Sequence, residues 1–213
     1  MSKISLAAAI RDVAGRDPVL ANLVAVAGPI TYRPGDPDGR FGALVRAITF
    51  QQLAGPAARA IHQRVRALVD GPLTPEALAA VPDDALRGAG LSAAKLASLR
   101  DLSSKVMEGS VVLGASGRSS DDDIVAGLTT VRGIGRWTAE MYLMFELRRL
   151  DVWPVDDLGV RQGYALAWGL DPPPSARALE PLGDRFRPYR SIVARYCWEA
   201  VALYRGGTDP SLR

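Results

Sequence analysis

The most informative segment of the chain reads Val131-Arg132-Gly133-Ile134-Gly135-Arg136-Trp137-Thr138-Ala139, and Asp156-Asp157 follow farther along the chain. Because neither glycine carries a Cβ, the backbone around Gly133 and Gly135 can turn sharply and approach a ligand closely. A helix that begins after such a turn presents backbone N–H groups without partners in the helix, and these suit a phosphate. A Gly-x-Gly pair alone is more often an ordinary turn between two helices. Its meaning therefore depends on its neighbours.

Helical patterns lie on both sides of the two glycines. Residues 121–128 begin with three Asp and continue with apolar residues at helical spacing, and residues 136–149 form a longer, largely apolar pattern. The segment therefore predicts a helix, a glycine hairpin and a second helix. A dinucleotide-binding βαβ unit is disfavoured because no strand pattern and no third glycine are present. A P-loop is excluded because Gly-Lys-Ser/Thr is missing.

The rest of the chain has the same helical periodicity, interrupted by turn residues, and predicts an all-α protein. Helices are expected near residues 5–13, 17–27, 41–51, 55–69, 75–80, 83–88, 92–108, 121–128, 136–149, 157–168, 175–184 and 187–205. Breaks rich in Pro and Gly lie at 28–40 and 169–175. We therefore expect two helical lobes with the active site in the cleft between them. Residues 1–40 with 170–213 form one lobe, and residues 41–169, with the hairpin 129–138 and the Asp pair, form the other.

Composition favours an anionic partner and gives no sign of a membrane. The 213 residues carry a formal net charge of +3, and only three of the 26 basic side chains are Lys. Arginine suits bidentate contacts with phosphate, although GC-rich codon usage enriches it equally well. The single cysteine, Cys197, cannot form an internal disulfide and cannot alone hold zinc or an iron-sulfur cluster. The chain shows no signal-peptide pattern and no apolar run of transmembrane length, so we expect a cytoplasmic, nucleoid-associated bacterial protein.

The Asp pair stands at a predicted helix start. Pro154 forces the residue before it out of helical geometry, so a new helix is expected to begin at Asp156-Asp157. The commonest role for one of the two carboxylates is to cap the helix, so the other can take a different role. A carboxylate near a helix N-terminus is held ionised and can stabilise positive charge or orient water. Cleavage of an N-glycosidic bond creates such a charge, because the sugar acquires oxocarbenium character.

Aromatic residues could hold a base that has been flipped out of a duplex, because every base offers a face for stacking. The available ones are Trp137, Tyr142, Trp153, Tyr189 and Trp198. For any one of them, packing in the core is the commoner role.

These residues resemble the helix-hairpin-helix, Gly/Pro-Asp (HhH-GPD) superfamily of DNA glycosylases, and within it the branch of 3-methyladenine DNA glycosylase II. The resemblance runs from about Phe41 to Tyr204. Its main carriers are residues 128–138, Asp156–Arg161, and Pro188–Ser191 with Trp198. The hairpin with a downstream Asp is specific for the superfamily, and Arg136–Ala139 with Asp-Asp-Leu-Gly is fairly specific for the branch.

The resemblance implies roles for particular residues. Asp157 would be the catalytic carboxylate, with Asp156 as its partner at the helix start. The base pocket would be lined by Trp137, Trp198 and Met141, the last standing where some members have an aromatic residue. Contacts with DNA would come from Gly133, Gly135, Arg136, Thr138 and Arg190.

Two further roles follow from the same resemblance. One of Gln51, Gln52 and Leu53 would fill the gap that the flipped base leaves in the duplex, although packing at a helix end is an equally good interpretation. A structural Na⁺ or K⁺ would bind the backbone carbonyls of Thr129, Val131 and Ile134, and no other cofactor is expected.

The chain also departs from parts of the superfamily. Trp137 stands where strand-cutting relatives carry a lysine whose amine forms a Schiff base, and no lysine follows Lys105. The cysteine cluster of the iron-sulfur branch and the N-terminal β-domain of longer members are missing. We therefore expect a monomeric, monofunctional glycosylase that excises alkylated purines of the 3-methyladenine and 7-methylguanine type from double-stranded DNA. The alternatives are a non-catalytic lesion-binding protein and a glycosylase for deaminated or oxidised bases.

The sequence Arg59-Ala60-Ile61-His62-Gln63-Arg64 carries the only histidine of the chain. Without a second histidine or a matching cysteine, His62 is expected on the solvated surface rather than at a metal. Arg59, Arg64 and Arg66 either add to a phosphate-facing patch or form a solvated face.

Overall fold

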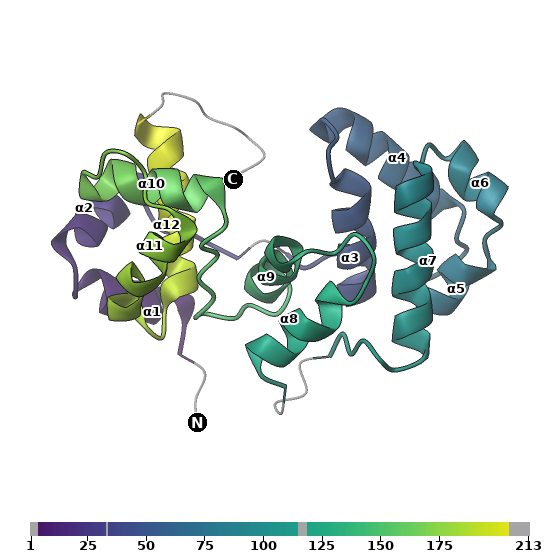
Figure 1. The fold of residues 1–213 in the computed structure, drawn as a ribbon, viewed down its shortest axis with the longest axis horizontal. Coiled ribbons are helices and arrows are strands. Elements are labelled where there is room, and N and C mark those ends of the chain that lie inside the picture. The colour runs from purple at the N-terminus through teal and green to yellow at the C-terminus, as the bar shows by residue number, and fades with distance from the viewer. Residues whose placement is uncertain (1–3, 33, 115–118, 205–213) are drawn as a thin grey trace. The chain divides into compact units, whose positions relative to one another are not determined.

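A computed structural model describes residues 4–32, 34–114 and 119–204, and in these residues all regular secondary structure is helical (Figure 1). The all-α prediction is therefore confirmed. The elements are α1 (Leu6–Ala14), α2 (Pro18–Ala27), α3 (Gly39–Phe50), α4 (Gly55–Ala67), α5 (Pro75–Ala80), α6 (Asp83–Gly88), α7 (Ala93–Met107), α8 (Asp121–Thr129), α9 (Arg136–Phe145), α10 (Leu158–Trp168), α11 (Ala176–Leu182), the 3₁₀ turn η1 (Asp184–Phe186) and α12 (Arg190–Tyr204).

Most helix bounds lie within two residues of those expected, because local capping signals mark them. Thr74 and Ser92 cap α5 and α7 through their hydroxyl oxygens. The main difference is α9, which was expected to reach residue 149 and ends at Phe145. Arg148 adopts a φ of 55°, a left-handed conformation through which an α-helix cannot continue.

The chain folds into two compact units. Unit 1 comprises residues 1–33 and 148–213, and unit 2 comprises residues 34–147. These divisions differ from the expected ones after residues 40 and 169, because α10 belongs with α12. The proline-rich break at 169–175 is a connection inside unit 1 rather than a boundary. Asp157 therefore lies in unit 1, whereas the hairpin lies in unit 2.

The core of unit 1 is built on close contact between α10 and α12. A Cβ added to Gly163 would lie 1.8 Å from the carbonyl oxygen of Cys197, so the two helices meet backbone to backbone. Cys197 is fully buried there, and this burial raises the pKa of its thiol. Its lack of solvent access makes it a packing residue.

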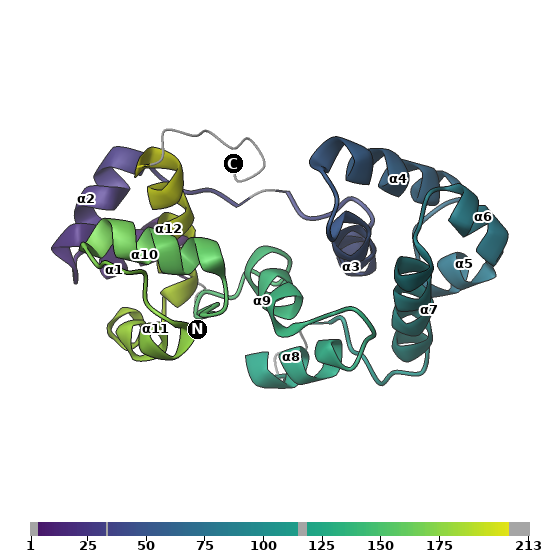
Figure 2. The ribbon, with the colours of Figure 1, turned by 45° about the horizontal axis from the view of Figure 1, so that its top comes forward.

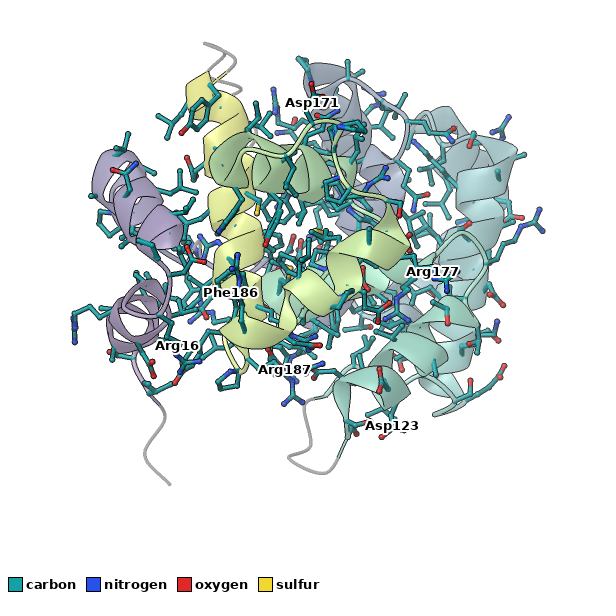
Figure 3. All side chains as sticks on the ribbon, turned by 60° about the vertical axis from the view of Figure 1, so that its left-hand side comes forward. Arg16, Asp123, Asp171, Arg177, Phe186 and Arg187 are labelled. Atoms are coloured by element: carbon teal, nitrogen blue, oxygen red, sulfur yellow. The ribbon has the colours of Figure 1, made fainter. Side chains whose placement is uncertain are left out.

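An aromatic cluster completes unit 1. The rings of Tyr164 and Trp168 stack with their centroids 4.3 Å apart, and Phe186 lies against Trp168. Trp168 donates its indole N–H to Asp17, the N-cap of α2, at 3.2 Å. On the surface, the Arg16 guanidinium donates to the Arg187 carbonyl oxygen at 2.6 Å (Figure 3). These contacts tie α1 and α2 to the C-terminal half of the unit.

Unit 2 is organised around α7, which packs against α3, α5 and α6 (Figure 2). The helices α8 and α9 pack against each other, and residues 130–135 connect them. The predicted helix, glycine hairpin and helix are thus present. No helix in the described residues is both long and apolar enough to cross a membrane.

Candidate functional site

The hairpin between α8 and α9 requires a glycine at position 133. Gly133 has a φ of +78°, and an added Cβ would lie 2.6 Å from the Ser98 hydroxyl oxygen, so any other residue there would be strained and crowded. Gly135 is the N-cap of α9 and supplies no side-chain acceptor. A helix start without a side-chain cap is suited to bind a phosphate oxygen through its backbone N–H groups.

The residues of α9 that were predicted to contact DNA or the base differ in how exposed their side chains are. Trp137 is 49% exposed, and Met141, one turn later on the same face, is half-buried. Arg136 keeps 60% of its side chain exposed while its Nε donates to the Glu140 Oε1 at 2.9 Å. Thr138 is buried, so its side chain is not a DNA contact and only its backbone N–H suits that role.

In the loop after α3, the structure distinguishes the three residues that the sequence left as equal candidates for filling the gap in the duplex. Gln51 donates its side-chain amide to the Gly133 carbonyl oxygen at 2.9 Å and is thereby tied to the hairpin. Gln52 adopts a φ of 56°, a left-handed conformation that is costly for a residue with a Cβ. Leu53 is 40% exposed. Of the three, Leu53 is the one that presents an apolar side chain to solvent.

Asp157, and not Asp156, stands at the start of α10. It is the N-cap of α10, and its Oδ1 accepts the Val160 N–H at 2.7 Å and the Trp198 indole N–H at 2.9 Å. Only 9% of the residue is exposed. Asp156 is exposed and does not cap the helix, so the assignment of the helix-start role to Asp156 is wrong.

The contact between Asp157 and Trp198 depends on a glycine between them. A Cβ added to Gly159 would lie 2.8 Å from the Trp198 Cδ1 and 3.1 Å from the Asp157 Oδ1. Gly159 thus leaves the space in which the indole reaches the carboxylate. Trp198, expected as a wall of the base pocket, is observed as the group that fixes the orientation of Asp157.

For the glycosylase activity that the resemblance implies, replacing Trp198 by Phe should slow base release by about tenfold or more, because a hydrogen bond to a charged group contributes roughly 1.5–3 kcal/mol. The change keeps an aromatic ring and removes the indole donor. Trp168→Phe is the matched control, since it removes another indole donor to a capping carboxylate, that of Asp17. Single-turnover rates should fall only in the Trp198 variant. Equal rates for both variants would show that the indole donor does not orient Asp157.

The side chains of three arginines bond to groups of the protein itself, which disfavours a role in binding DNA. Arg190 is 14% exposed, and its Nε and Nη2 bond the two carboxylate oxygens of Asp151 at 2.8 and 3.0 Å. Arg64 donates to the Ala89 carbonyl, and Arg66 pairs with Asp38. The expectation that Arg190 contacts DNA is therefore not supported. Its guanidinium ties the start of α12 to the loop between α9 and α10.

His62 was expected to be solvated and is instead half-buried. Its ring meets Phe50 edge-on with centroids 6.2 Å apart, and burial lowers the pKa of the imidazole. The described residues contain no group of three or more His, Cys, Asp or Glu side chains placed to hold a metal ion. His62 is therefore a packing residue between α3 and α4.

The other candidate aromatic residues are core residues. Trp153 donates its indole N–H to the Leu179 carbonyl at 3.1 Å, and Tyr189 is buried. Tyr142 donates its hydroxyl to the Leu113 carbonyl at 2.8 Å, and burial raises the pKa of that hydroxyl. Each lies among its neighbours rather than on a surface that a base could reach.

The hairpin carbonyls meet one cationic group in the structure. The Lys105 amine donates to the Thr130 carbonyl, next to the predicted cation ligand Thr129. Of the other predicted ligands, Val131 accepts the Ile134 N–H at 3.0 Å through its carbonyl oxygen. Backbone carbonyls suit a monovalent cation chemically, and its binding here stays a prediction.

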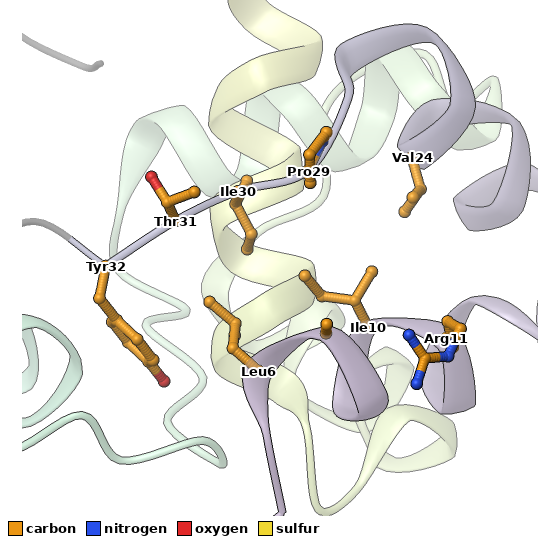
Figure 4. Close-up of a pocket in the computed structure, with 9 residues that line it drawn as sticks. Leu6, Ile10, Arg11, Val24, Pro29, Ile30, Thr31 and Tyr32 are labelled. Atoms are coloured by element: carbon orange, nitrogen blue, oxygen red, sulfur yellow. The ribbon is translucent and has the colours of Figure 1, made fainter.

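The two cavities described within unit 1 lie away from these residues. The larger, with a volume of about 540 Å³, is enclosed by α1, α2 and residues 29–32 (Figure 4). Its walls are mostly apolar, with Leu6, Ile10 and Ile30 among them. The second, near Leu170, is also separate from Asp157. The candidate site is therefore defined by its side-chain chemistry rather than by these cavities.

Comparisons with known proteins agree with this chemistry. The family model for HhH-GPD superfamily base excision DNA repair protein matches residues 45–188. DNA-3-methyladenine glycosylase 1 of Schizosaccharomyces pombe is 32% identical over 205 residues, which cover 93% of this chain and 89% of that protein.

Solved structures show the same similarity. The crystal structure of DNA-3-methyladenine glycosidase from Bacillus halodurans has a TM-score of 0.85 and 34% identity, covering 93% of this chain and 91% of that one. The Schizosaccharomyces pombe 3-methyladenine DNA glycosylase in complex with abasic DNA has a TM-score of 0.77 and 31% identity, with coverages of 94% and 99%.

Proposed function

Because the chain belongs to the HhH-GPD superfamily of base excision DNA repair proteins, we propose that it hydrolyses the N-glycosidic bond of alkylated purines in DNA. The 3-methyladenine and 7-methylguanine type is the substrate class. One observation carries the proposal: a nearly buried carboxylate, Asp157, is held in a single orientation by a helix start and an indole N–H. A fixed anion of this kind can stabilise an oxocarbenium-like sugar at little reorganisation cost.

The reaction of an alkylated purine needs an anion that stabilises the sugar, and it needs no proton donor for the leaving base. N3- or N7-alkylation makes the purine cationic, so the base accepts the bonding pair on leaving and becomes neutral without a proton donor. Water then bonds to the sugar C1′ and loses a proton. Asp157 stabilises the positive charge on the sugar between these two events.

The lysines of the described residues support hydrolysis rather than Schiff-base chemistry. Lys95 donates its amine to the Thr49 carbonyl at 2.7 Å, and Lys105 pairs with Asp101 and donates to Thr130. Both amines serve structural contacts, and Trp137 occupies the hairpin position at which strand-cutting relatives carry lysine. The proposal is therefore a monofunctional glycosylase that leaves an abasic site.

DNA would be bound by the hairpin and the loop after α3. The N–H groups near Gly133 and Gly135 suit a phosphate, and Arg136 adds an exposed guanidinium. Arg132 at the hairpin turn is also exposed and was not among the expected contacts. We further expect the protein to act as a monomer on the bacterial nucleoid in the cytoplasm.

Leu53 is the side chain we assign to the gap left by the flipped base, so Leu53→Ala should slow excision from duplex DNA by about tenfold. The loss should be smaller at a mismatched site, because unpairing there costs less. Leu170→Ala is the control, since Leu170 is 41% exposed against 40% for Leu53 and lies in unit 1. Single-turnover rates on both duplexes measure the effect. An equal loss on both substrates would contradict the assignment.

The substrate class is tested by identifying the base that is released. Methylated duplex DNA is incubated with the protein, and free bases are separated by chromatography. Release of 3-methyladenine or 7-methylguanine supports the proposal. Release of uracil or 8-oxoguanine from matched duplexes, with no methylated base, would favour another glycosylase. Tight binding to methylated DNA without release would favour a lesion-binding protein.

A further inference from the structure

One face of α7 carries side chains that reach both DNA-contact segments of unit 2. Lys95, Ser98, Asp101 and Lys105 follow each other at spacings of three or four residues, which places them along one side of the helix. Lys95 bonds the Thr49 carbonyl at the end of α3, just before the loop that carries Leu53. The other three contact the hairpin.

The hairpin contacts of α7 centre on an ion pair. The Asp101 Oδ2 accepts the Arg132 N–H at 2.6 Å and the Lys105 amine at 2.8 Å. The same amine donates to the Thr130 carbonyl. The hydrogen bond from Lys105, followed by that from the Arg132 backbone, holds the pKa of Asp101 below its usual range. Asp101 is thus ionised directly behind the turn.

An ionised carboxylate at this place creates an electrostatic conflict. It fixes the turn by holding a backbone N–H, but its charge repels a phosphate that approaches the neighbouring amides. Lys105 resolves the conflict, because its ammonium lies on the same carboxylate oxygen and cancels the charge. The pair as a whole is neutral and still supplies the acceptor that Arg132 requires.

We propose that the Asp101–Lys105 pair is the positioning unit of the DNA-binding hairpin, in which Asp101 sets the turn and Lys105 masks its charge from the DNA phosphate. The proposal rests on the proposed function in one respect, the binding of DNA phosphate by the hairpin. Neither residue touches DNA in this account. The bond from Gln51 to Gly133 then couples the hairpin, set in this way, to the loop that carries Leu53.

If Lys105 masks the charge of Asp101, variants of the pair should bind DNA in an order that a purely structural pair would not show. Lys105→Gln leaves a bare carboxylate behind the turn and should weaken DNA binding by about tenfold at low salt, with a smaller loss at high salt. Asp101→Asn keeps an oxygen acceptor for the Arg132 N–H and should bind as tightly as wild type or more so. The double variant should recover most of the binding that Lys105→Gln loses. Asp101→Ala removes the acceptor and should bind more weakly than Asp101→Asn.

The experiment measures fluorescence anisotropy of a labelled abasic duplex at several salt concentrations, with thermal unfolding of each variant alongside. Arg16→Gln is the matched control, because Arg16 also pairs with an Asp at i−4, Asp12, and donates to a backbone carbonyl, that of Arg187. It should alter stability without altering binding. A double variant as weak as Lys105→Gln, or unchanged binding by Lys105→Gln, would overturn the proposal.

Base release by the wild type is measured separately, so that failure of the positioning role can be distinguished from failure of the proposed function. If the wild type releases no base but the variants bind in the expected order, the positioning role stands and the proposed function fails. If the wild type releases methylated base and the expected order is absent, the proposed function stands and the positioning role fails.

Discussion

Asp157→Asn is expected to slow release of methylated base by at least about 10²–10³-fold, because it removes the negative charge that stabilises the sugar cation. The fold should survive the change. Asparagine caps helices about as well as aspartate, and its side-chain oxygen can still accept the N–H groups of Val160 and Trp198. Single-turnover release and anisotropy on the same methylated duplex measure rate and binding.

The matching control is Asp17→Asn, which changes the capping carboxylate of α2, also bonded by an indole N–H. It should leave the rate of base release unaltered. A rate for Asp157→Asn within a few-fold of wild type would show that the charge of Asp157 is not needed. Loss of both activity and cooperative unfolding would instead show that the residue acts only as a cap.

Gly163→Ala should destabilise unit 1 by about 3 kcal/mol or more, at the upper end of overpacking effects. The added Cβ would lie 1.8 Å from the Cys197 carbonyl oxygen, which is backbone and cannot rotate away. The two helices must separate, and α12 carries Trp198 with it. Thermal unfolding should shift down by roughly 6–12 °C for a chain of this size.

Gly127→Ala provides the comparison, because a Cβ at this helical glycine has no neighbour within 4 Å. It should stabilise the protein by up to about 1 kcal/mol through the higher helix propensity of alanine. Calorimetry of the two variants gives both values. A Gly163→Ala variant as stable as wild type would mean that α10 and α12 are not in backbone contact.

The helices and the hairpin could be predicted because their signals are local. Capping residues such as Ser92 lie next to the helices that they begin, and the pair Gly133 and Gly135 indicates a turn without further context. Asp157 was likewise singled out as the candidate catalytic residue from its place after Pro154 and from the family resemblance. Its role as the helix cap was missed, because either of two adjacent aspartates can cap a helix and the sequence does not distinguish them.

The contacts that sequence could not predict join residues far apart in the chain. Arg190 looked like a DNA contact because the sequence does not show Asp151 beside it. In the sequence, Asp101 and Lys105 form an ordinary i,i+4 pair. Their hydrogen bonds with the backbone of Arg132 and Thr130 become visible only once α7 is packed against the hairpin. The unit boundaries were misplaced for the same reason, since Gly163 gives no sign in the sequence that it meets Cys197.

The most direct test of hydrolysis by Asp157 is strand breakage in an end-labelled duplex with one 7-methylguanine, assayed with and without brief mild alkali, which breaks the strand at abasic sites but not at intact 7-methylguanine. Wild-type protein is expected to produce breaks only after alkali, at the methylated position, and Asp157→Asn is expected to produce no breaks above background while still binding the duplex. Breaks without alkali, or equal breaks with Asp157→Asn, would contradict hydrolysis that depends on Asp157.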